Sequence, residues 1–471
     1  MGYPHFVIAA LKTVANAGCY LISRGRLLLL EGRWWRGFYA NWSGDRRYQT
    51  DLHTPASEAE VVELVARSRT MRVVGAGHSF NDGLWTDGST VSLDGLSGII
   101  DIDRGAKQVR VAAGTRLRDL TSALLAEGLA FRALASHDAQ SIGGLLATDV
   151  HGTGREPAHF SDQVVSLRLV DGRGAVHELT PDDELFRAAV GGIGALGIVT
   201  EVRLQCVDAF DLRQTSMVET RAWAEERLDR LLREHDHVSF YAYPFTDLLH
   251  VHTWDRTSAP RSPLGLWREA ANQSKAAVMA GTVGDATAHL GKLPRTASSG
   301  MRLQAASNLV LRSHEAFNRS QYHLHQELEL AVPLDRVWHD LDTMLELYER
   351  MYAAAPLPFL LVEVRFTPGG HDRTLLGAGV DRDTAWLCLC LNQSGRVGDY
   401  FDAVEGWMRT EAGSHARLHL GKWCERLDAS DLARLHGERF ERFRQARAVA
   451  DPDGRFINPF TERMLGPVGG A

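Results

Sequence analysis

A histidine that directly follows a glycine-rich turn is the first residue of this chain with a recognisable chemical setting. It is His78, in the stretch VVGAGHSFNDGLWTDG at residues 73–88. Two more glycine-rich stretches follow it, SIGGLLATDVHGTG at 141–154 and GGIGALGIVT at 191–200. One such stretch would as readily be an ordinary turn. Because glycine lets backbone N–H groups approach an anion closely, three of them favour a phosphate-bearing ligand.

These glycines do not follow the Rossmann pattern. That pattern needs GxGxxG at the opening of a helix and an acidic residue about 20 positions further on. After Gly75 and Gly77 the chain continues His-Ser-Phe-Asn, with no third glycine to open a helix. A nucleotide bound by these loops must therefore be held in another way.

An acidic and a basic residue stand two apart in the stretch PFLLVEVRFT. The stretch predicts a strand, so Glu363 and Arg365 should share one face, with Val362, Val364 and Phe366 on the other. On an arbitrary strand such a pair is more often a solvated surface ion pair. The pair alone therefore does not identify a site.

Bulk properties limit the possible functions. The 471 residues exceed the roughly 250–300 at which single cores split, so two domains are expected. A net charge of −7 argues against a general nucleic-acid binder. The five cysteines are scattered and lack metal-ligand spacing, which indicates a reducing, cytoplasmic compartment and no metal site.

The N-terminus has a different composition from the rest. Residues 1–50 contain seven Lys or Arg against Glu31 and Asp45. Charged residues interrupt the apolar stretch 6–30 well short of the roughly 18 residues that a spanning helix needs, and no secretory signal precedes it. A basic, Trp-bearing, amphipathic segment is typical of peripheral contact with an anionic membrane surface. A helix packed on the protein's own body is the alternative.

The spacing of apolar residues predicts alternating helices and strands up to about residue 205. SEAEVVELVARS begins with a capping box, Ser57 followed by Glu60, and predicts a helix. TRLRDLTSALLAEG predicts another helix, ending at Gly128. RVVGAG and VRVAAG predict short strands, and VVSLRLVDGRGAVHELT predicts two strands around a turn.

The second half is less regular. Residues 256–300 are broken by Pro and Ser and give no assignment. QELELAVPLDRVWHDLDTMLELYERM then predicts a strand and a helix. Residues 431–460 predict one helix followed by a Pro-Asp-Gly turn.

Seven stretches of the chain occur in one order: VVGAGHSFND, VRVAAGTRLRDL, SIGGLLATDVHGTG, GALGIVTEVRLQCV, VEVRFT, HLGKW and DPDGRFINPFTERML. In this order they resemble the FAD flavoproteins of the vanillyl-alcohol-oxidase type. Within that group the chain is similar to the aldonolactone oxidase branch, which includes L-gulonolactone, D-arabinonolactone and alditol oxidases. The resemblance covers about residue 42 to the C-terminus.

The resemblance implies an α+β fold. A PCMH-type FAD-binding domain of two subdomains is expected at 42–205, and a cap domain with an antiparallel sheet flanked by helices at 206–425. Residues 426–471 are expected to return to the FAD-binding domain. Residues 1–41 form a basic N-terminal extension outside the resemblance.

The resemblance also implies FAD as the cofactor, joined covalently through its C8 methyl group to His78. Many relatives read TGTHG where this chain reads TDVHG, so Asp149 and Val150 depart from the family pattern. The other residues implied for cofactor binding are Val74, Gly75, Ala76, Gly77, Ser79 and Phe80 around the pyrophosphate, and Ser136, Ser141, Gly144, Thr148, His151, Gly152, Ile198 and His419 elsewhere along the cofactor.

Glu363, Arg365 and Lys422 are the catalytic residues that the resemblance implies, and with Ser136 they are expected to bind substrate. Oxidation of an alcohol by hydride transfer to flavin N5 requires the hydroxyl to lose a proton, and the reduced flavin gains negative charge. Glu363 is expected to orient or deprotonate the hydroxyl. Arg365 would stabilise the developing charge, and Lys422 would bind substrate oxygens.

The substrate implied is a sugar 1,4-lactone oxidised at C2. An alditol is the alternative, although AWLCLCLNQS places cysteines and leucines where alditol oxidases carry polar residues or histidine. Ala135 lies where this superfamily controls access of O2, and both O2 and a cytochrome or quinone stay open as acceptors. A noncatalytic, membrane-associated flavoprotein is a further alternative.

Overall fold

The structure is a computed structural model in which residues 33–35, 37–304, 306–318, 323–370, 372–393 and 395–468 are described. Most of the predicted membrane-contacting extension, residues 1–32, therefore lies outside the described residues. Within the described ranges, no helix combines the length and the apolar character needed to cross a membrane.

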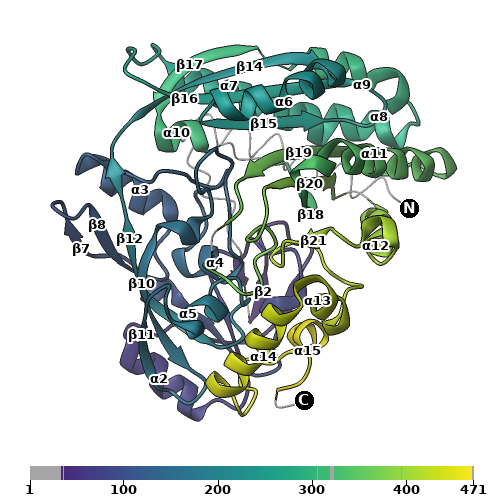
Figure 1. The fold of residues 1–471 in the computed structure, drawn as a ribbon. Helices are drawn as coiled ribbons and strands as arrows, with labels where there is room; N and C mark the ends of the chain where they lie inside the picture. The colour runs from purple at the N-terminus through teal and green to yellow at the C-terminus, as the bar shows by residue number, and fades with distance from the viewer. Residues whose placement is uncertain are drawn as a thin grey trace.

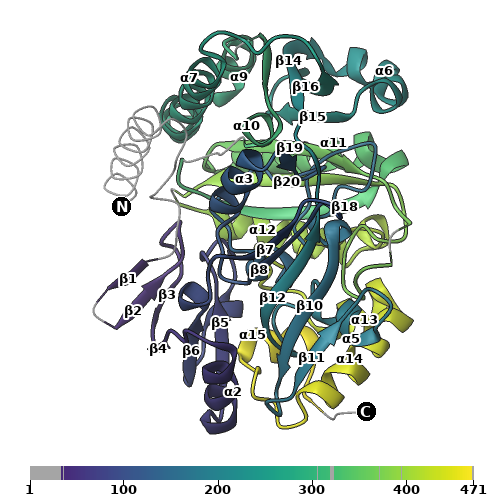
Figure 2. The same ribbon diagram turned by 90° about the vertical axis from the view of Figure 1, so that its left-hand side faces the viewer.

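Two sheets of the lower body carry the segments around the cavity (Figures 1 and 2). The smaller sheet is parallel, in the order β4-β6-β5, and the larger is antiparallel, in the order β11-β10-β12-β8-β7. The strands are β4 (Asp51–His53), β5 (Met71–Val74), β6 (Ser89–Ser92), β7 (Ile99–Asp103), β8 (Gln108–Ala112), β10 (Val164–Asp171), β11 (Val176–Leu179) and β12 (Gly197–Gln205). The strands predicted in this half are confirmed.

Helices pack against these sheets. Helix α2 begins after Ser57, whose side chain accepts a hydrogen bond from the backbone N–H of Glu60, and it buries Val61, Leu64 and Val65. The predicted helix and its Ser57 cap are therefore confirmed, whereas the Glu60 carboxylate accepts its hydrogen bond from the N–H of Ala56 (2.9 Å) instead of that of Ser57. The helices of this body are α2 (Glu58–Arg67), α3 (Leu117–Ala126), α4 (Ile142–Ala147) and α5 (Glu184–Ala189).

An eight-stranded antiparallel sheet forms the cap above this body, in the order β17-β14-β16-β15-β19-β20-β18-β21. Helices α6, α11 and α12 cover its apolar face (Figures 1 and 2). The strands are β14 (Asp211–Thr220), β15 (His237–Ala242), β16 (Leu248–Thr257), β17 (Ser307–Arg312), β18 (His325–Pro333), β19 (Leu360–Thr367), β20 (Thr384–Asn392) and β21 (Arg417–Leu418), and the helices are α6 (Arg221–Glu234), α11 (Val337–Ala354) and α12 (Val397–Met408).

Two parts of the chain differ from the sequence-based expectation. The unassigned stretch 256–300 is mainly helical: α7 (Gly265–Val278), the π-helix η4 (Met279–Gly284), α8 (Asp285–His289) and α9 (Leu293–Arg302). The single helix predicted near the C-terminus is wrong. Gly437, with a φ of +55°, separates α13 (Ala429–His436) from α14 (Glu438–Ala450), and α15 (Pro459–Leu465) follows.

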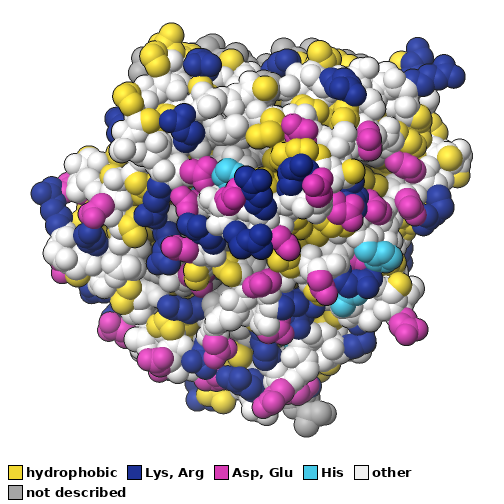
Figure 3. All heavy atoms as spheres, turned by 45° about the horizontal axis from the view of Figure 1, so that its top comes forward, with side chains coloured by type: hydrophobic (Ala, Val, Ile, Leu, Met, Phe, Trp, Pro, Cys, Tyr) yellow, Lys and Arg dark blue, Asp and Glu magenta, His cyan; other side chains and the backbone are white. Residues whose placement is uncertain are grey.

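The surface of the molecule carries charges of both signs. On the face shown in Figure 3, Lys and Arg side chains are interspersed with Asp and Glu side chains. The four described cysteines, Cys206, Cys388, Cys390 and Cys424, are free thiols and buried.

The buried side chain of Arg72 links the C-terminal segment to the glycine-rich loops by hydrogen bonds. The Arg72 guanidinium donates hydrogen bonds to the carbonyl oxygens of Gly83 (2.6 Å), Ile193 (2.6 Å), Phe456 (2.8 Å) and Gly194 (3.2 Å). Arg72 is 3% exposed, and burial lowers its pKa to about 10. Since these carbonyls come from three distant segments, Arg72 fixes how those segments lie against one another.

Replacement of Arg72 by Met should lower the free energy of unfolding by about 3 kcal/mol or more, because four buried carbonyls lose their charged donor. The measurement is urea unfolding of the FAD-loaded protein. Arg69 is exposed, so Arg69→Met is the matched control and should change the free energy by less than about 0.5 kcal/mol. Equal effects of the two substitutions would contradict the assigned role of Arg72.

Candidate functional site

A long cavity runs between the lower body and the cap. The glycine-rich loops form its lower part, and the polar face of the cap sheet closes its upper end. The lining includes residues 75–79, 135–137, Gln140, Ser141, Gly143, Gly144, Ala147, Thr148, Val150, His151, Ile193, Gly194, 196–199, Glu327, Glu329, Glu363, Arg365, Cys388 and 419–422.

Glycine is required where the first loop meets α4. A Cβ atom at Gly75 would collide with the Ser141 Oγ atom, so a larger residue would force the Ser141 side chain to rotate away. Gly77 has a φ of +71°, a conformation that L side chains rarely adopt. Ser141 in turn caps α4 through the N–H of Gly144. The loop can therefore pass close to the start of α4 only with this sequence.

Most of the residues predicted to bind the cofactor line this cavity. Three do not line it. Val74 and Phe80 are buried in the hydrophobic core. Gly152 packs directly against the backbone carbonyl of Leu134, where a Cβ atom would not fit. Those that line it are Gly75, Ala76, Gly77, His78, Ser79, Ser136, Ser141, Gly144, Thr148, His151, Ile198 and His419.

Asp149, which departs from the family pattern, turns away from the cavity. Its backbone has a φ of +49°, a region that Asp tolerates better than most residues. Its carboxylate accepts a hydrogen bond from Ser161 Oγ (2.7 Å) and pairs with His159 Nδ1 (3.0 Å). The acid therefore replaces the family's glycine without placing a negative charge in the cavity, while Val150 contributes to the lining.

The cavity suits a long polar cofactor. His137 Nδ1 and Gln140 Oε1 line it, are buried, and have no hydrogen-bond partner among the described residues. Buried polar atoms of this kind need a partner, which a bound molecule would supply. Together with the close-packed glycine loop, they fit the nucleotide and flavin of FAD.

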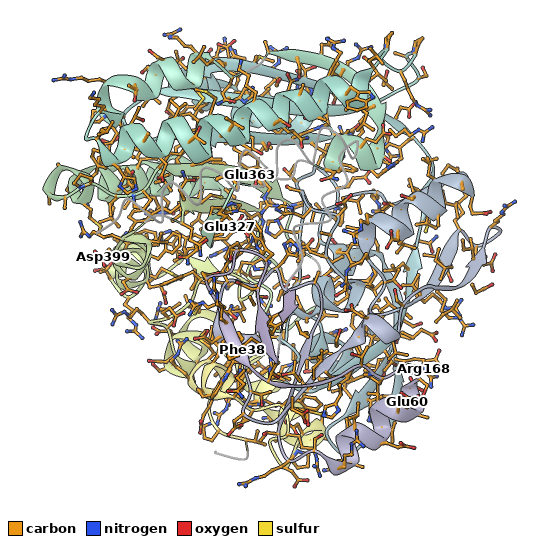
Figure 4. All side chains as sticks on the ribbon, turned by 180° about the vertical axis from the view of Figure 1, so that it is seen from behind. Phe38, Glu60, Arg168, Glu327, Glu363 and Asp399 are labelled. Atoms are coloured by element: carbon orange, nitrogen blue, oxygen red, sulfur yellow. The ribbon has the colours of Figure 1, made fainter. Side chains whose placement is uncertain are left out.

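The cap end of the cavity carries a row of charged side chains (Figure 4). Glu363 and Arg365 share one face of β19, and their Oε2 and Nε atoms are 3.8 Å apart. Val362, Val364 and Phe366 pack in the core on the other face, as predicted. Tyr241 Oη donates a hydrogen bond to Glu363 Oε1 (3.2 Å). The E-x-R pair is therefore a buried pair inside a cavity.

Two further glutamates, on the strand β18, neutralise the site's cations. Arg365 forms an ion pair with Glu329, and Lys422 forms one with Glu327. Burial opposes the charged form of all four groups. In each pair the opposite charge overrides burial, so the pKa values of Lys422 and Arg365 are raised and those of Glu327 and Glu329 are held well below their usual range.

The segment HLGK reaches Glu327 because it runs along the edge of β18. Strand β21 pairs with β18, and beyond it the N–H groups of His419 and Trp423 donate to the carbonyls of Glu329 (3.0 Å) and Glu327 (2.7 Å). Lys422 lies between these two anchor points.

The same segment is joined to the loop that carries His78. The N–H of Phe80 donates to Gly421 O (3.1 Å), and Asn81 Nδ2 donates to the carbonyls of Leu420 and Lys422 (both 2.8 Å). The cap's lysine and the lower body's histidine are thus held by one hydrogen-bonded unit.

Neutral histidines surround the charged pairs. Burial lowers the pKa of His137 and His419 to about 4 and that of His151 to about 3. The His151 ring stacks on Trp386, with ring centroids 3.7 Å apart, and its backbone carbonyl accepts a hydrogen bond from Arg365 (3.2 Å). Near neutral pH, the positive charge of the site is therefore carried by Arg365 and Lys422.

Two buried trios have ligand atoms close enough to hold a metal ion: His151, Glu329 and His419, and His325, Glu327 and Cys390. In both trios the carboxylate already pairs with a cation, Arg365 or Lys422. A metal ion would have to compete with that cation, so the trios favour ion pairing over metal binding.

The sequence reasoning missed Glu327, Glu329, Cys388 and His137 as lining residues. A signal for the glutamates was present in QELELAVP, where two acids alternate with leucines on a strand that was predicted. Leu328 and Leu330 are fully buried on one face of this strand, and Glu327 and Glu329 are buried on the other.

Comparisons with known proteins agree with this arrangement. Residues 52–180 match the family described as FAD binding domain, and residues 202–464 match the family described as D-arabinono-1,4-lactone oxidase. The chain belongs to the D-arabinono-1,4-lactone oxidase family. FAD is its cofactor, and the predicted oxidoreductase family is confirmed.

Two relatives match nearly the whole chain. L-gulono-1,4-lactone dehydrogenase of Mycobacterium tuberculosis is 30% identical over 435 residues, which cover 91% of this chain and 99% of the relative. L-gulonolactone oxidase of Mus musculus is 27% identical over 452 residues, which cover 91% and 98%.

The fold is shared with a solved structure. A cholesterol oxidase from Brevibacterium sterolicum superposes with a TM-score of 0.76 at 17% identity, covering 92% of this chain and 98% of the other. The predicted fold class, a PCMH-type FAD-binding domain with a cap of antiparallel sheet and helices, is confirmed.

The buried histidines predict how stability depends on pH. In the folded protein His137 and His419 stay neutral down to about pH 4, whereas in the unfolded chain they bind a proton near pH 6.5. The unfolded state therefore binds more protons between these values, so the free energy of unfolding should fall as the pH is lowered, by about 1.4 kcal/mol per pH unit for each histidine.

Urea unfolding of the FAD-loaded protein at several pH values between 7 and 4 measures this slope. The variant His419→Gln removes one titrating group and should show a shallower slope than the parent. The same slope in both proteins would contradict the assignment of His419 as a neutral, buried imidazole.

Proposed function

We propose that this protein oxidises an aldono-1,4-lactone at C2, with FAD as the electron acceptor. The observation that carries the proposal is the Glu363 carboxylate beside Arg365, at the cap end of a cavity that the FAD-binding domain forms. The two relatives that match nearly its full length are named for L-gulono-1,4-lactone and L-gulonolactone. These names support a sugar lactone as the substrate class.

Glu363 is the carboxylate best placed to accept the proton of the substrate hydroxyl. Glu327 and Glu329 are each neutralised by a direct ion pair, whereas Glu363 lies 3.8 Å from its nearest cation. The hydrogen bond from Tyr241 fixes one of its oxygens. A carboxylate held in this way can receive a proton without first breaking a close ion pair.

The two cations stabilise the oxygen that loses this proton. Arg365 and Lys422 stay charged because of their partners on β18, and both line the cavity. In a buried site their attraction for a developing negative charge is stronger than in water. FAD, when bound, supplies a two-electron acceptor for the hydrogen that leaves the carbon as hydride.

The function is tested by anaerobic bleaching of the bound flavin with a panel of aldonolactones and alditols. L-gulono-1,4-lactone should bleach it. Glu363→Gln should leave the flavin bound but lower the reduction rate by about 100-fold or more, because general base catalysis typically contributes 10²–10⁴-fold.

A buried glutamate remote from the cavity serves as the control. Glu405 is fully buried and accepts hydrogen bonds from the backbone N–H groups of residues 425–427, so Glu405→Gln should bleach at the parental rate. Bleaching by alditols alone would overturn the lactone assignment. Unchanged reduction in Glu363→Gln would overturn the assigned role. Reoxidation by O2 or by cytochrome c then identifies the class of acceptor.

The proposal includes a covalent bond between His78 and the flavin. His78 lines the cavity, stacks on Trp42 with ring centroids 5.8 Å apart, and lies on the loop that passes α4. A covalent bond generally raises the flavin's potential, which would favour oxidation of an unactivated alcohol.

Acid precipitation tests this bond. The yellow colour should stay with the precipitated parental protein and should pass into the supernatant with His78→Ala. His137 is its neighbour in the cavity, with ring centroids 5.5 Å apart, so His137→Ala is the control and should retain the flavin. Free flavin from the parental protein would show that the bond does not form.

A cytoplasmic location and peripheral membrane contact through residues 1–41 are also part of the proposal. They rest on the composition of the sequence: scattered cysteines and a basic, Trp-bearing N-terminus.

A further inference from the structure

A second cavity lies in the cap, on the same face of the eight-stranded sheet as the charged site. Its walls come from β14, β15, β16 and α7, with His323 at one side. Tyr241 lines it and is the cross-strand neighbour of Glu363, to which its hydroxyl donates a hydrogen bond. The hydrogen-bonded pair of Tyr241 and Glu363 therefore stands between the two cavities, with one residue lining each.

Several polar side chains line the second cavity. His323 is 1% exposed, and neither of its ring nitrogens has a hydrogen-bond partner among the described residues. Burial holds its pKa well below the usual range, so the ring offers one donor and one acceptor. An unsatisfied buried polar group is unfavourable, so this wall fits a polar occupant. The other polar wall residues include Gln214, Ser216, His250, His252 and Gln304.

The charges of the walls limit the chemistry of that occupant. None of the described residues that line the cavity is a lysine or arginine. Its one carboxylate, on Glu269, accepts hydrogen bonds from Gln214 Nε2 (2.9 Å) and Gln273 Nε2 (3.0 Å). A phosphate or carboxylate would meet the carboxylate of Glu269 with no cation in the described lining to offset it, and an apolar group would leave the two ring nitrogens of His323 without a partner. A neutral chain of hydroxyl groups satisfies both conditions.

We propose that the second cavity binds the hydroxylated side chain of the lactone, while Glu363 faces the ring. This inference rests on the proposed function. Tyr241 is on the strand next to that of Glu363, about 5 Å away across the sheet. His250 is on the following strand, about 10 Å from Glu363. A side chain that extends from the ring past Tyr241 therefore reaches the imidazoles of His250 and His252, whose ring nitrogens are 3.1 Å apart.

The cavity makes the enzyme selective for lactones that carry free hydroxyl groups on the side chain. Removal of the polar contacts should raise KM for such a lactone and leave a lactone without a side chain unaffected. A role of the cavity in stability alone would affect both substrates equally.

The test compares L-gulono-1,4-lactone with 2-hydroxy-γ-butyrolactone, which has the ring and the C2 hydroxyl but no side chain. Steady-state oxidation of each lactone by the FAD-loaded full chain, with a dye as the electron acceptor, gives kcat/KM for each. The variants are His323→Leu, which removes the polar wall, and Ala276→Met, which fills the cavity from α7. Both should lower kcat/KM for gulonolactone about tenfold or more, mainly through KM, and change it less than twofold for the butyrolactone.

The control is His436→Leu, which replaces another buried histidine. His436 is 6% exposed, has an unpartnered Nδ1 among the described residues, and lines neither cavity, so its variant should not change the ratio of the two substrates. If His323→Leu does not fold, the comparison of the two lactones is made with Ala276→Met alone.

Equal losses for both lactones, or no loss for either, would overturn the inference. A parental protein that is reduced by neither lactone would overturn the proposed function itself, so the two failures are distinguishable.

Discussion

The charged site depends on two carboxylates of a single strand. A guanidinium or ammonium group buried alone would destabilise the fold by several kcal/mol; beside the cavity Arg365 is buried and the Lys422 side chain is 20% exposed. Glu327 and Glu329 offset this by direct ion pairs. Because the two acids are occupied by these pairs, Glu363 is left as the carboxylate that can exchange a proton. Strand β18 thus sets the charge of the whole site.

The position of the site follows from how the cap and the lower body are joined. The HLGK segment pairs with the edge of β18 on one side and binds the loop of His78 on the other. Arg72 ties that loop to the C-terminal segment and to the third glycine-rich stretch. The residues of the cap and those of the FAD-binding domain are therefore held in one arrangement by hydrogen bonds to backbone carbonyls, several of them donated by the side chains of Asn81 and Arg72.

Much of this could be predicted from the sequence, and the reasons are physical. The glycine loops, the helix after Ser57 and the alternating strand of Glu363 and Arg365 have strong local patterns, and the seven ordered stretches identified the family. The helices between 265 and 302 were missed because small and polar residues hide their periodicity, and Gly437 was not recognised as a break because a single glycine within a helical pattern is often tolerated.

The ion pairs were missed for a different reason. Glu327 and Lys422 are 95 residues apart in the chain, and Glu329 and Arg365 are 36 apart, so no local spacing links the partners. Asp149 likewise looked like a disturbance of the cofactor loop, whereas its partners, Ser161 and His159, come from a turn beyond the motif. Pairings of this kind depend on strand order and on loop contacts, which the sequence pattern does not specify.

The central claim is that Glu327 is needed because Lys422 is largely buried, and a double-mutant cycle on the free energy of unfolding tests it most directly. Glu327→Gln leaves the Lys422 ammonium group without its carboxylate, Lys422→Met leaves the Glu327 carboxylate without its cation and with His325 Nε2 still beside it (2.8 Å), and the double variant removes both charges. We expect each single variant to be less stable than the double variant, with a coupling energy of about 3 kcal/mol. Additive effects of the two substitutions would contradict the account.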